Sequence, residues 1–498
     1  MILNIMKTSS FLTVTLLLAS SLASSSDVIG FRGPALHFLD ADHPVYFKDA
    51  LLVVNATSGT VLDFDEFQKI SEKFVFSSIR TYSSDQLITP GFIDCHSHAP
   101  QIDMIGSYGY SLEEWLHDYT FPSEAKYMDV QFAESSTKRY FNQLLRLCIC
   151  ARISRQAREK SALNGRLLYA LMPRFLTTST PAELETWAKL YRDLPEVFFH
   201  THIAENLQVT ISSVARFKEK AARFYEPDSK ILDAIRSSVT QLEIWNAYGL
   251  LTDRTSFAHG IHLTHLDYEL LRNSSATLCH CPTSNLFLDS GLFNLGEAIA
   301  NKLDVGVGTD IGAGTTFELL STMGEVYKVA ISSAESVSNI AKPDEPYLNT
   351  NNTKSDYRIP VKQSYRVSPF TQLYMLTLGT ARQLRVDNYV GNFVKGKEAD
   401  FVVLDLLPSP LHARRLHAYA LNNNPSDIEY LSQAIFGITA VGHDRSVAET
   451  YILGKKAYDR ELNYLDPLDN DYFLNMTDGR EIVHLDKSNS VPIIVSSL

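Results

Sequence analysis

The alternation of apolar and polar residues changes character twice along the chain. Residues 28–90 alternate over short runs separated by turn residues, a pattern that predicts small β structure. Through the middle of the chain, short apolar runs alternate with helix-like stretches, which predicts parallel βα units. Two short strands over 391–405 and one over 449–453 follow. The chain is therefore predicted to be α/β, with β segments on either side of a βα body.

Polar side chains capable of catalysis stand where the predicted central strands end. Because side chains at i and i+2 of a strand share a face, His96 and His98 can converge on one point after the strand at 87–93. In a parallel βα barrel the carboxyl ends of the strands meet and assemble the active site. Later strands, predicted at 197–205, 255–260, 276–282 and 305–310, supply His202, His259, His280 and Asp310.

Three imidazoles and a carboxylate suit a mononuclear metal site, with zinc favoured and iron(II) possible. His200 shares the strand phase of His202 and is expected to line the same pocket. His280 is expected to pack in its strand and not to bind the metal. Among the helices, Thr180, Pro181 and Glu183 form a helix start, and one helix is predicted over 231–246.

Composition excludes some classes of protein. The 498 residues are 45% hydrophobic and 20% charged, with a net charge of -12, so no nucleic-acid footprint is visible. The five cysteines form no C-x-x-C pair, and buried or free thiols are expected rather than a disulfide framework. Residues 1–26 resemble a secretory signal with cleavage after Ala23, and no stable membrane span is expected.

Several motifs together carry a family resemblance. They are Pro90-Gly91-Phe92-Ile93-Asp94-Cys95-His96-Ser97-His98, Pro173-Arg174-Phe175, His202-Ile203-Ala204-Glu205, Ala258-His259-Gly260, His280-Cys281-Pro282-Thr283-Ser284-Asn285 and Gly308-Thr309-Asp310. The chain resembles the amidohydrolase superfamily and, within it, the guanine deaminase family. The resemblance implies a (β/α)8 TIM-like barrel over 89–385, flanked by a β-sandwich built from 27–88 and 386–460, with a tail over 461–498. It also implies that about two of the eight strands are missing between Tyr140 and Leu167.

The resemblance assigns roles residue by residue. It implies zinc, about one ion per chain, with iron(II) less favoured. The expected reaction is hydrolysis of guanine, a small purine, to xanthine and ammonia. The family also implies a homodimer and a cytoplasmic enzyme, whereas residues 1–26 favour the secretory pathway. The implied metal ligands are His96, His98, His202 and Asp310, the substrate contacts Gln101, Arg174, Phe175 and Glu205, and the catalytic groups Glu205, His259 and Asp310.

Two other functions remain open at this point. The chain could be another aminohydrolase of the superfamily acting on a different heterocycle, although Gln101 and the Pro173-Arg174-Phe175 segment argue against that. It could instead be a catalytically dead remnant that acts only as a binding protein, because a barrel that lacks strands exposes unpaired edges. Bound zinc together with guanine turnover would separate these hypotheses.

Overall fold

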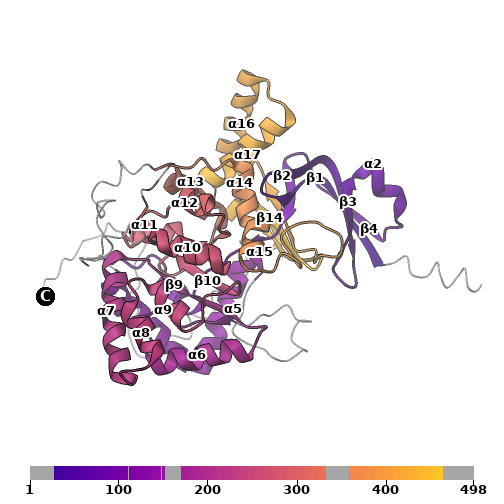
Figure 1. The fold of residues 1–498 in the computed structure, drawn as a ribbon. Helices are drawn as coiled ribbons and strands as arrows, with labels where there is room; N and C mark the ends of the chain where they lie inside the picture. The colour runs from indigo at the N-terminus through magenta and orange to yellow at the C-terminus, as the bar shows by residue number, and fades with distance from the viewer. Residues whose placement is uncertain are drawn as a thin grey trace, which may run out of the picture.

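One sheet is built from the two ends of the chain (Figure 1). The computed structural model describes residues 27–109, 112–146, 149–151, 170–332, 358–360, 362, 364–442 and 444–463. The sheet has the order β15-β14-β13-β5-β1-β2-β3, with β4 also paired to β1. The strands from residues 28–90 and those from 401–459 are hydrogen-bonded into this one sheet, in the region where a β-sandwich from both chain ends was expected. Its strands are β1 (Val28–Asp40), β2 (His43–Asn55), β3 (Val61–Glu66), β4 (Ser78–Thr81), β5 (Gln86–Pro90), β13 (Phe401–Asp405), β14 (Val447–Ile452) and β15 (Lys455–Asp459).

The pairing of β5 with β13 joins the two halves of the sheet. The strands are antiparallel, with Pro90 opposite Phe401. Aromatic rings from both halves then pack in one core: the ring centroid of Phe401 lies 4.7 Å from that of Phe31 and 4.4 Å from that of Tyr451. Because β5 ends at Pro90 and the next strand begins at Phe92, the sheet anchors the segment that carries His96 and His98.

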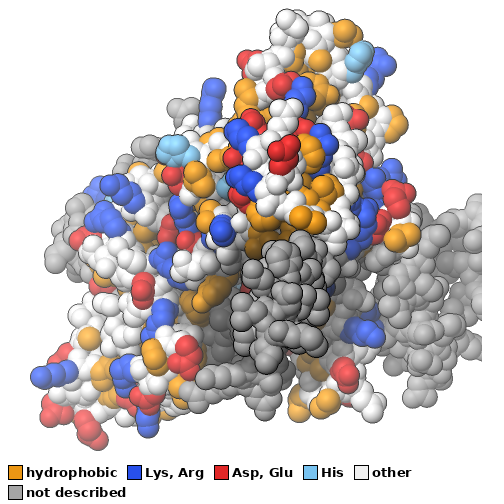
Figure 2. Space-filling model, turned by 90° about the vertical axis from the view of Figure 1, so that its right-hand side faces the viewer, with side chains coloured by type: hydrophobic (Ala, Val, Ile, Leu, Met, Phe, Trp, Pro, Cys, Tyr) orange, Lys and Arg blue, Asp and Glu red, His pale blue; other side chains and the backbone are white. Residues whose placement is uncertain are grey.

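The C-terminal segment is more helical than predicted. The helices α16 (Pro410–Asn423) and α17 (Asp427–Ala440) stand between β13 and β14 and project from the body in Figure 1. Their start signals were present, since Ser426 and Glu429 form a capping box. The prediction of two strands over 391–405 is wrong in part, because only β13 forms there. Figure 2 shows hydrophobic side chains among the charged ones on this projecting pair.

The centre of the molecule is a parallel sheet with the order β12-β11-β10-β9-β8. Helices connect consecutive strands, as the alternating pattern predicted. The strands are β8 (Ala170–Leu171), β9 (Phe198–Ile203), β10 (Thr255–His259), β11 (Thr277–His280) and β12 (Val305–Val307). The connecting helices are α6 (Pro181–Asp193), α7 (Leu207–Phe224), α8 (Lys230–Ser237), α9 (Gln241–Ala247), α10 (His265–Ser274), α11 (Pro282–Phe287) and α12 (Leu295–Ala300).

A further parallel pair extends this sheet. The strand β6 (Phe92–Ile93) pairs with β7 (Ile149–Ala151). Just beyond β6, the Cys95 amide donates to the Val307 carbonyl at 3.1 Å and the Asp310 amide donates to the His96 carbonyl at 2.8 Å. These bonds place β6 beside β12, so the described strands run β7-β6-β12-β11-β10-β9-β8. Most of the interval predicted to lack two strands lies outside the described residues, so that prediction stays a prediction.

Two helix predictions had different outcomes. Thr180 caps α6 with the expected capping box to Glu183 and with Pro181 in the first turn. The single helix predicted over 231–246 is wrong, because α8 ends at Ser237 and α9 begins at Gln241 with its own capping box on Thr240. The helical spacing of apolar residues continues through the interval between the two helices, which is why one helix was predicted. The capping box on Thr240 starts the second helix at Gln241.

The described helices include none that is both long and apolar enough to cross a membrane. The signal-like residues 1–26 and nearly all of the predicted tail lie outside the described residues.

Candidate metal centre and substrate pocket

Four buried side chains meet at the carboxyl ends of three strands. His96 and His98 follow β6, His202 lies near the end of β9, and Asp310 follows β12. One potential ligand atom of each lies within 4.8 Å of the others. The Nε2 atoms of His96 and His98 lie 3.2 and 3.0 Å from Oδ1 of Asp310. The structure therefore brings together all four residues predicted to hold a metal.

Hydrogen bonds behind the rings orient two of these histidines. Nδ1 of His96 lies 2.7 Å from Nε2 of His200, and Nδ1 of His202 lies 2.8 Å from the carbonyl oxygen of Arg174. A carbonyl can only accept, so Nδ1 of His202 carries the proton and its Nε2 is left with a lone pair. Such outer contacts fix the tautomer and the direction of metal-binding imidazoles.

The backbone around the cluster adopts conformations that side-chain-bearing residues avoid. Asp310 has φ of 50°, His259 of 71° and Ala204 of 45°. Left-handed conformations at non-glycine residues cost about 1–3 kcal/mol each and concentrate at functional sites. Each of the three stands at the end of a strand or just after it, where the turn directs the neighbouring polar side chain inward.

The donor set fits a divalent metal ion. The Nε2 atoms of His96 and His98 lie 3.2 Å apart and both face the carboxylate of Asp310. Burial lowers the pKa of His96 to about 4 and that of His202 well below its usual value, so both rings are neutral at pH 7, the form that binds metals. Burial alone would raise the pKa of Asp310, but the two neighbouring histidines hold it well below its usual range.

A second group of polar side chains borders the cluster. Nε2 of His259 lies 3.7 Å from Oε2 of Glu205 and 3.8 Å from Oδ2 of Asp310. Its Nδ1 lies 2.9 Å from Oδ1 of Asn285. His259 Nε2 is buried and has no hydrogen-bond partner among the described residues, which leaves it available to a ligand. Burial raises the pKa of Glu205, so this carboxyl takes up a proton more readily than an exposed glutamate.

One pocket touches most of the predicted site residues. Its lining includes apolar residues of the helical segment over 112–116. Phe175 lies beside His202 with its ring centroid 5.3 Å away, which gives the pocket an aromatic wall. The polar and aromatic lining comprises His98, Gln101, Trp115, Arg174, Phe175, His202, Glu205 and Asp310.

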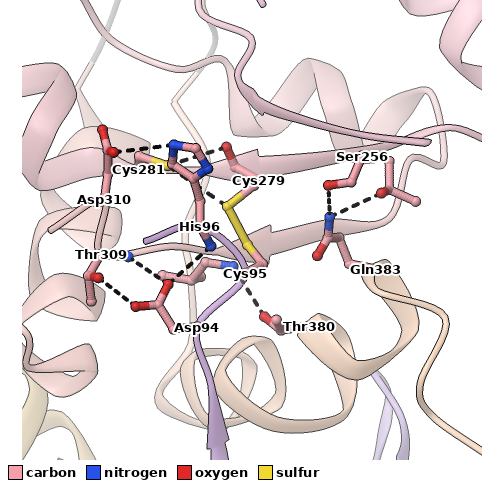
Figure 3. Close-up of a disulfide and its surroundings, with 12 residues drawn as sticks. Asp94, Cys95, His96, Ser256, Cys279, Cys281, Thr309, Asp310, Thr380 and Gln383 are labelled. Atoms are coloured by element: carbon pink, nitrogen blue, oxygen red, sulfur yellow. Dashed lines mark hydrogen bonds and ion pairs between the residues drawn. A yellow bond between two sulfur atoms is a disulfide. The ribbon is translucent and has the colours of Figure 1, made fainter. Parts of the chain in front are cut away.

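A disulfide joins Cys95 to Cys279 directly before His96 (Figure 3). The prediction of thiols is wrong for these two residues. Cys95 follows β6 and Cys279 lies on β11, 184 positions later in the sequence, and only the fold brings them together. The bond ties the end of β6 to β11, and β12 lies between them. Cys281 is a buried free thiol, with its sulfur 3.8 Å from that of Cys279.

Asp94 links the segment before His96 to Thr309, which follows β12 (Figure 3). Its carboxylate accepts hydrogen bonds from the Thr309 amide at 3.0 Å and the Thr309 hydroxyl at 2.5 Å, and from the His96 amide at 3.1 Å. Burial raises the pKa of Asp94 to about 7. The residues before His96 and before Asp310 are thus held together independently of any ligand.

Sequence reasoning misplaced one residue of the site and missed the contacts of two others. His200 was expected in the pocket but lies behind His96, while His280 packs on Phe293 as expected. Asn285 was noted only as part of a motif, and its contact with His259 became visible only in the fold. Glu124, which binds both Gln101 and Arg174, had no signal beyond its place two residues after Pro122.

Comparisons with known proteins agree on one family. Residues 142–457 match the model of the amidohydrolase family. The chain is 31% identical to the guanine deaminase of Escherichia coli K12 over 467 residues, which cover 83% of this chain and 92% of that protein. The solved structure of E. coli guanine deaminase matches with a TM-score of 0.69 at 29% identity, covering 87% of this chain and 100% of that one. Guanine deaminase from Bradyrhizobium japonicum matches with a TM-score of 0.72 at 26% identity, covering 87% and 99%.

Proposed function

Because the chain belongs to the amidohydrolase family, we propose that it acts as a zinc-dependent guanine deaminase, converting guanine and water to xanthine and ammonia. One observation carries the proposal: the metal-ligand cluster and the predicted purine contacts Gln101, Arg174 and Phe175 border a single pocket. The pocket therefore offers a metal, hydrogen-bonding groups and an aromatic face to one small planar molecule.

His96, His98, His202 and Asp310 would hold the zinc ion. When bound there, zinc with an open position lowers the pKa of a water molecule to about 7 and so supplies a nucleophile at neutral pH. Iron(II) can use similar donors but is the less favoured ion.

The side chains around the cluster would handle the protons. As water adds to C2 of the purine, Glu205 gives a proton to the adjacent ring nitrogen. Asp310 accepts one proton of the attacking water and passes it to the amino group, so the C2–N bond breaks and ammonia leaves. The remaining proton of the C2 hydroxyl returns to Glu205 as the carbonyl forms. His259 lies between Glu205 and Asp310, and its Nδ1 donates to Oδ1 of Asn285. Its Nε2 can therefore donate to the developing oxyanion only when the ring carries a proton on both nitrogens. Atoms balance as guanine plus water giving xanthine plus ammonia.

The test is ammonia release from guanine by purified protein starting at residue 27, with zinc measured on the same sample. Release with about one zinc per chain supports the proposal. Zinc without guanine turnover would favour another aminohydrolase of the family. Folded protein with neither zinc nor turnover would favour the remnant that acts only as a binding protein.

The strands β6 to β12 are proposed to form a shortened version of the family barrel, flanked by the sheet from the two chain ends. A homodimer is proposed from the family resemblance. Exposed apolar residues of the α16–α17 pair support a contact surface there, with Leu411 63% and Leu421 73% exposed. Sedimentation of the parent protein and of Leu421→Lys tests this, since a dimer through the pair should dissociate in the variant.

Entry into the secretory pathway is proposed over the cytoplasmic location of the resemblance. The Cys95–Cys279 disulfide supports it, because disulfides persist mainly in oxidising compartments. Expression of the full chain in its own cell type, followed by N-terminal sequencing of protein from medium and cytosol, tests this. A mature N-terminus just after Ala23 in the medium is expected.

A further inference from the structure

Glu124 joins the two polar residues that face the predicted substrate. It lies on α4 (Phe121–Ala125), outside every strand that carries a metal ligand. Its Oε1 accepts a hydrogen bond from Nε2 of Gln101 at 2.9 Å and from Nη1 of Arg174 at 2.5 Å. The side chains of Arg174 and Glu124 are only 20% and 28% exposed, so this charge-assisted pair is largely shielded from water.

Gln101 and Arg174 each have a second polar atom that makes no hydrogen bond to the described residues. Oε1 of Gln101 and Nε of Arg174 are buried and have no hydrogen-bond partner among the described residues. Both residues line the pocket next to Glu205. Buried polar atoms are nearly always paired in native proteins, so two orphans beside one pocket indicate a ligand that pairs with them.

Glu124 decides which atom of the Gln101 amide is offered to that ligand. An ionised carboxylate only accepts hydrogen bonds, so the NH2 group of Gln101 must face Glu124. The amide oxygen must then face away from it, as an acceptor. Arg174 only donates, and its contact with Glu124 fixes the plane of its guanidinium. One side of the pocket therefore presents a fixed acceptor beside a fixed donor.

We infer that Glu124 is a positioning residue that sets this acceptor–donor polarity and thereby selects a 6-oxo over a 6-amino purine. The inference rests on the proposed function and adds a determinant of specificity to it. Guanine presents a carbonyl oxygen at C6, which accepts from Arg174, and the adjacent N1–H, which donates to Gln101. In 2,6-diaminopurine both signs are reversed, since position 6 carries an amino donor and N1 is a bare acceptor.

The energetic consequence is large because both contacts are buried. A site built to hydrogen-bond its substrate leaves its own groups unpaired when the complementary groups are missing, which can cost several orders of magnitude in kcat/KM. Replacing Glu124 by glutamine removes the constraint, because a facing amide can pair with either end of the Gln101 amide. Gln101 is then free to turn and to accept either edge.

The experiment compares ammonia release from guanine and from 2,6-diaminopurine by the zinc-loaded parent, Glu124→Gln and Glu124→Asp. The parent is expected to prefer guanine. In Glu124→Gln the preference should fall on the order of tenfold or more, with KM for guanine rising more than kcat falls and zinc content unchanged. Glu124→Asp keeps the carboxylate and should restore part of the preference. Glu113→Gln, an exposed glutamate on the neighbouring α3 (Leu112–Trp115), is the matched control and should behave as the parent.

The outcomes separate this inference from the proposed function. Equal losses on both substrates in Glu124→Gln, with the preference unchanged, would mean a merely structural role and would overturn the inference alone. A parent that releases no ammonia from guanine would overturn the proposed function and this inference with it. Should Glu124→Gln not fold, Glu124→Asp carries the test. Its side chain is one methylene shorter, so its carboxylate lies farther from Gln101 and Arg174 and the preference must fall measurably below that of the parent.

Discussion

Nε2 of His200 lies 2.7 Å from Nδ1 of His96, on the far side of the ring from Asp310. Burial lowers the pKa of both imidazoles, so the pair is neutral and one ring must donate to the other. For Nε2 of His96 to offer its lone pair to a metal, Nδ1 must carry the proton and His200 must accept it. His200 thus acts on the cluster without belonging to it.

His200→Leu should therefore weaken metal binding, since the acceptor that fixes the His96 tautomer is lost. Removing a residue that hydrogen-bonds a metal-binding histidine typically costs about 10–100-fold in metal affinity or activity. Zinc affinity measured by competition with a chelator is the readout. The exposed His417→Leu serves as control, and His200→Gln, which retains an acceptor, should recover part of the loss. Parent-like zinc affinity in His200→Leu would refute the orienting role.

Two variants should distinguish the loss of metal binding from the loss of proton transfer. His98→Ala removes a donor 3.0 Å from Asp310 and should abolish both zinc binding and ammonia release. Glu205→Gln keeps the four ligands and the pocket shape but removes the proton donor, so zinc should stay while turnover is lost. Zinc by mass spectrometry and ammonia by a coupled assay are measured on the same samples. Full activity of Glu205→Gln would show that another group moves the proton.

The disulfide should contribute to the stability of the metal centre. Cys95 precedes the predicted ligand His96, and its bond links it to Cys279, 184 positions later in the sequence. Native disulfides commonly contribute about 2–4 kcal/mol. Reduction of the parent, or the double change Cys95→Ser and Cys279→Ser, should lower the melting temperature and zinc retention. The doubly substituted chain should not respond to reductant, and an equal response in both chains would place the effect elsewhere.

Local patterns were sufficient for the parts of the site that lie within one strand or turn. His96 and His98 follow the same strand, so their placement follows from the two-residue periodicity. Glu205 lies three residues after His202 in one motif, so its placement follows from the family resemblance. The contacts that were missed join segments far apart in sequence, such as Cys95 with Cys279. No periodicity encodes which of several parallel strands become neighbours.

Helix prediction shows the same division between local and tertiary information. The cap on Thr180 was found because its partner Glu183 lies three residues away. The α16–α17 pair was missed although Ser426 carries an equally local signal, because the surrounding strands drew the whole segment into a β interpretation. Glu124 had neither signal, since its importance comes only from the two side chains that the fold brings to it.

Gly312→Ala should disturb the substrate side of the pocket. Gly312 has φ of +118°, and a Cβ added there would lie 2.2 Å from Oε1 of Gln101. The Gln101 side chain would have to leave its position, so KM for guanine should rise on the order of tenfold while zinc content stays constant. Gly249→Ala is the matched control, because it has φ of +70° but open space around the added Cβ. A similar rise of KM in the control would point to backbone strain rather than displacement of Gln101.

His37 should make the terminal sheet sensitive to acid. It is buried on β1, its Nδ1 accepts a hydrogen bond from the Phe393 amide at 3.4 Å, and the ring packs on Phe64. Burial, with a smaller effect from the charge of Lys397, lowers the pKa of His37 from 6.5 to about 4. Between these values the unfolded chain binds more protons than the folded one, so stability falls as pH falls from 6.5 towards 4.

The contribution of His37 to this loss is about 2 kcal/mol between pH 7 and pH 5. Urea unfolding of the parent and of His37→Gln at both pH values measures it. The variant cannot titrate at this position, so its free energy of unfolding should fall less over the interval, whatever its stability at pH 7. Buried His262 and His280, whose pKa values are also lowered, titrate in both chains and cancel in the comparison. Identical losses in parent and variant would mean that His37 is already protonated in the folded protein, or never becomes so on unfolding.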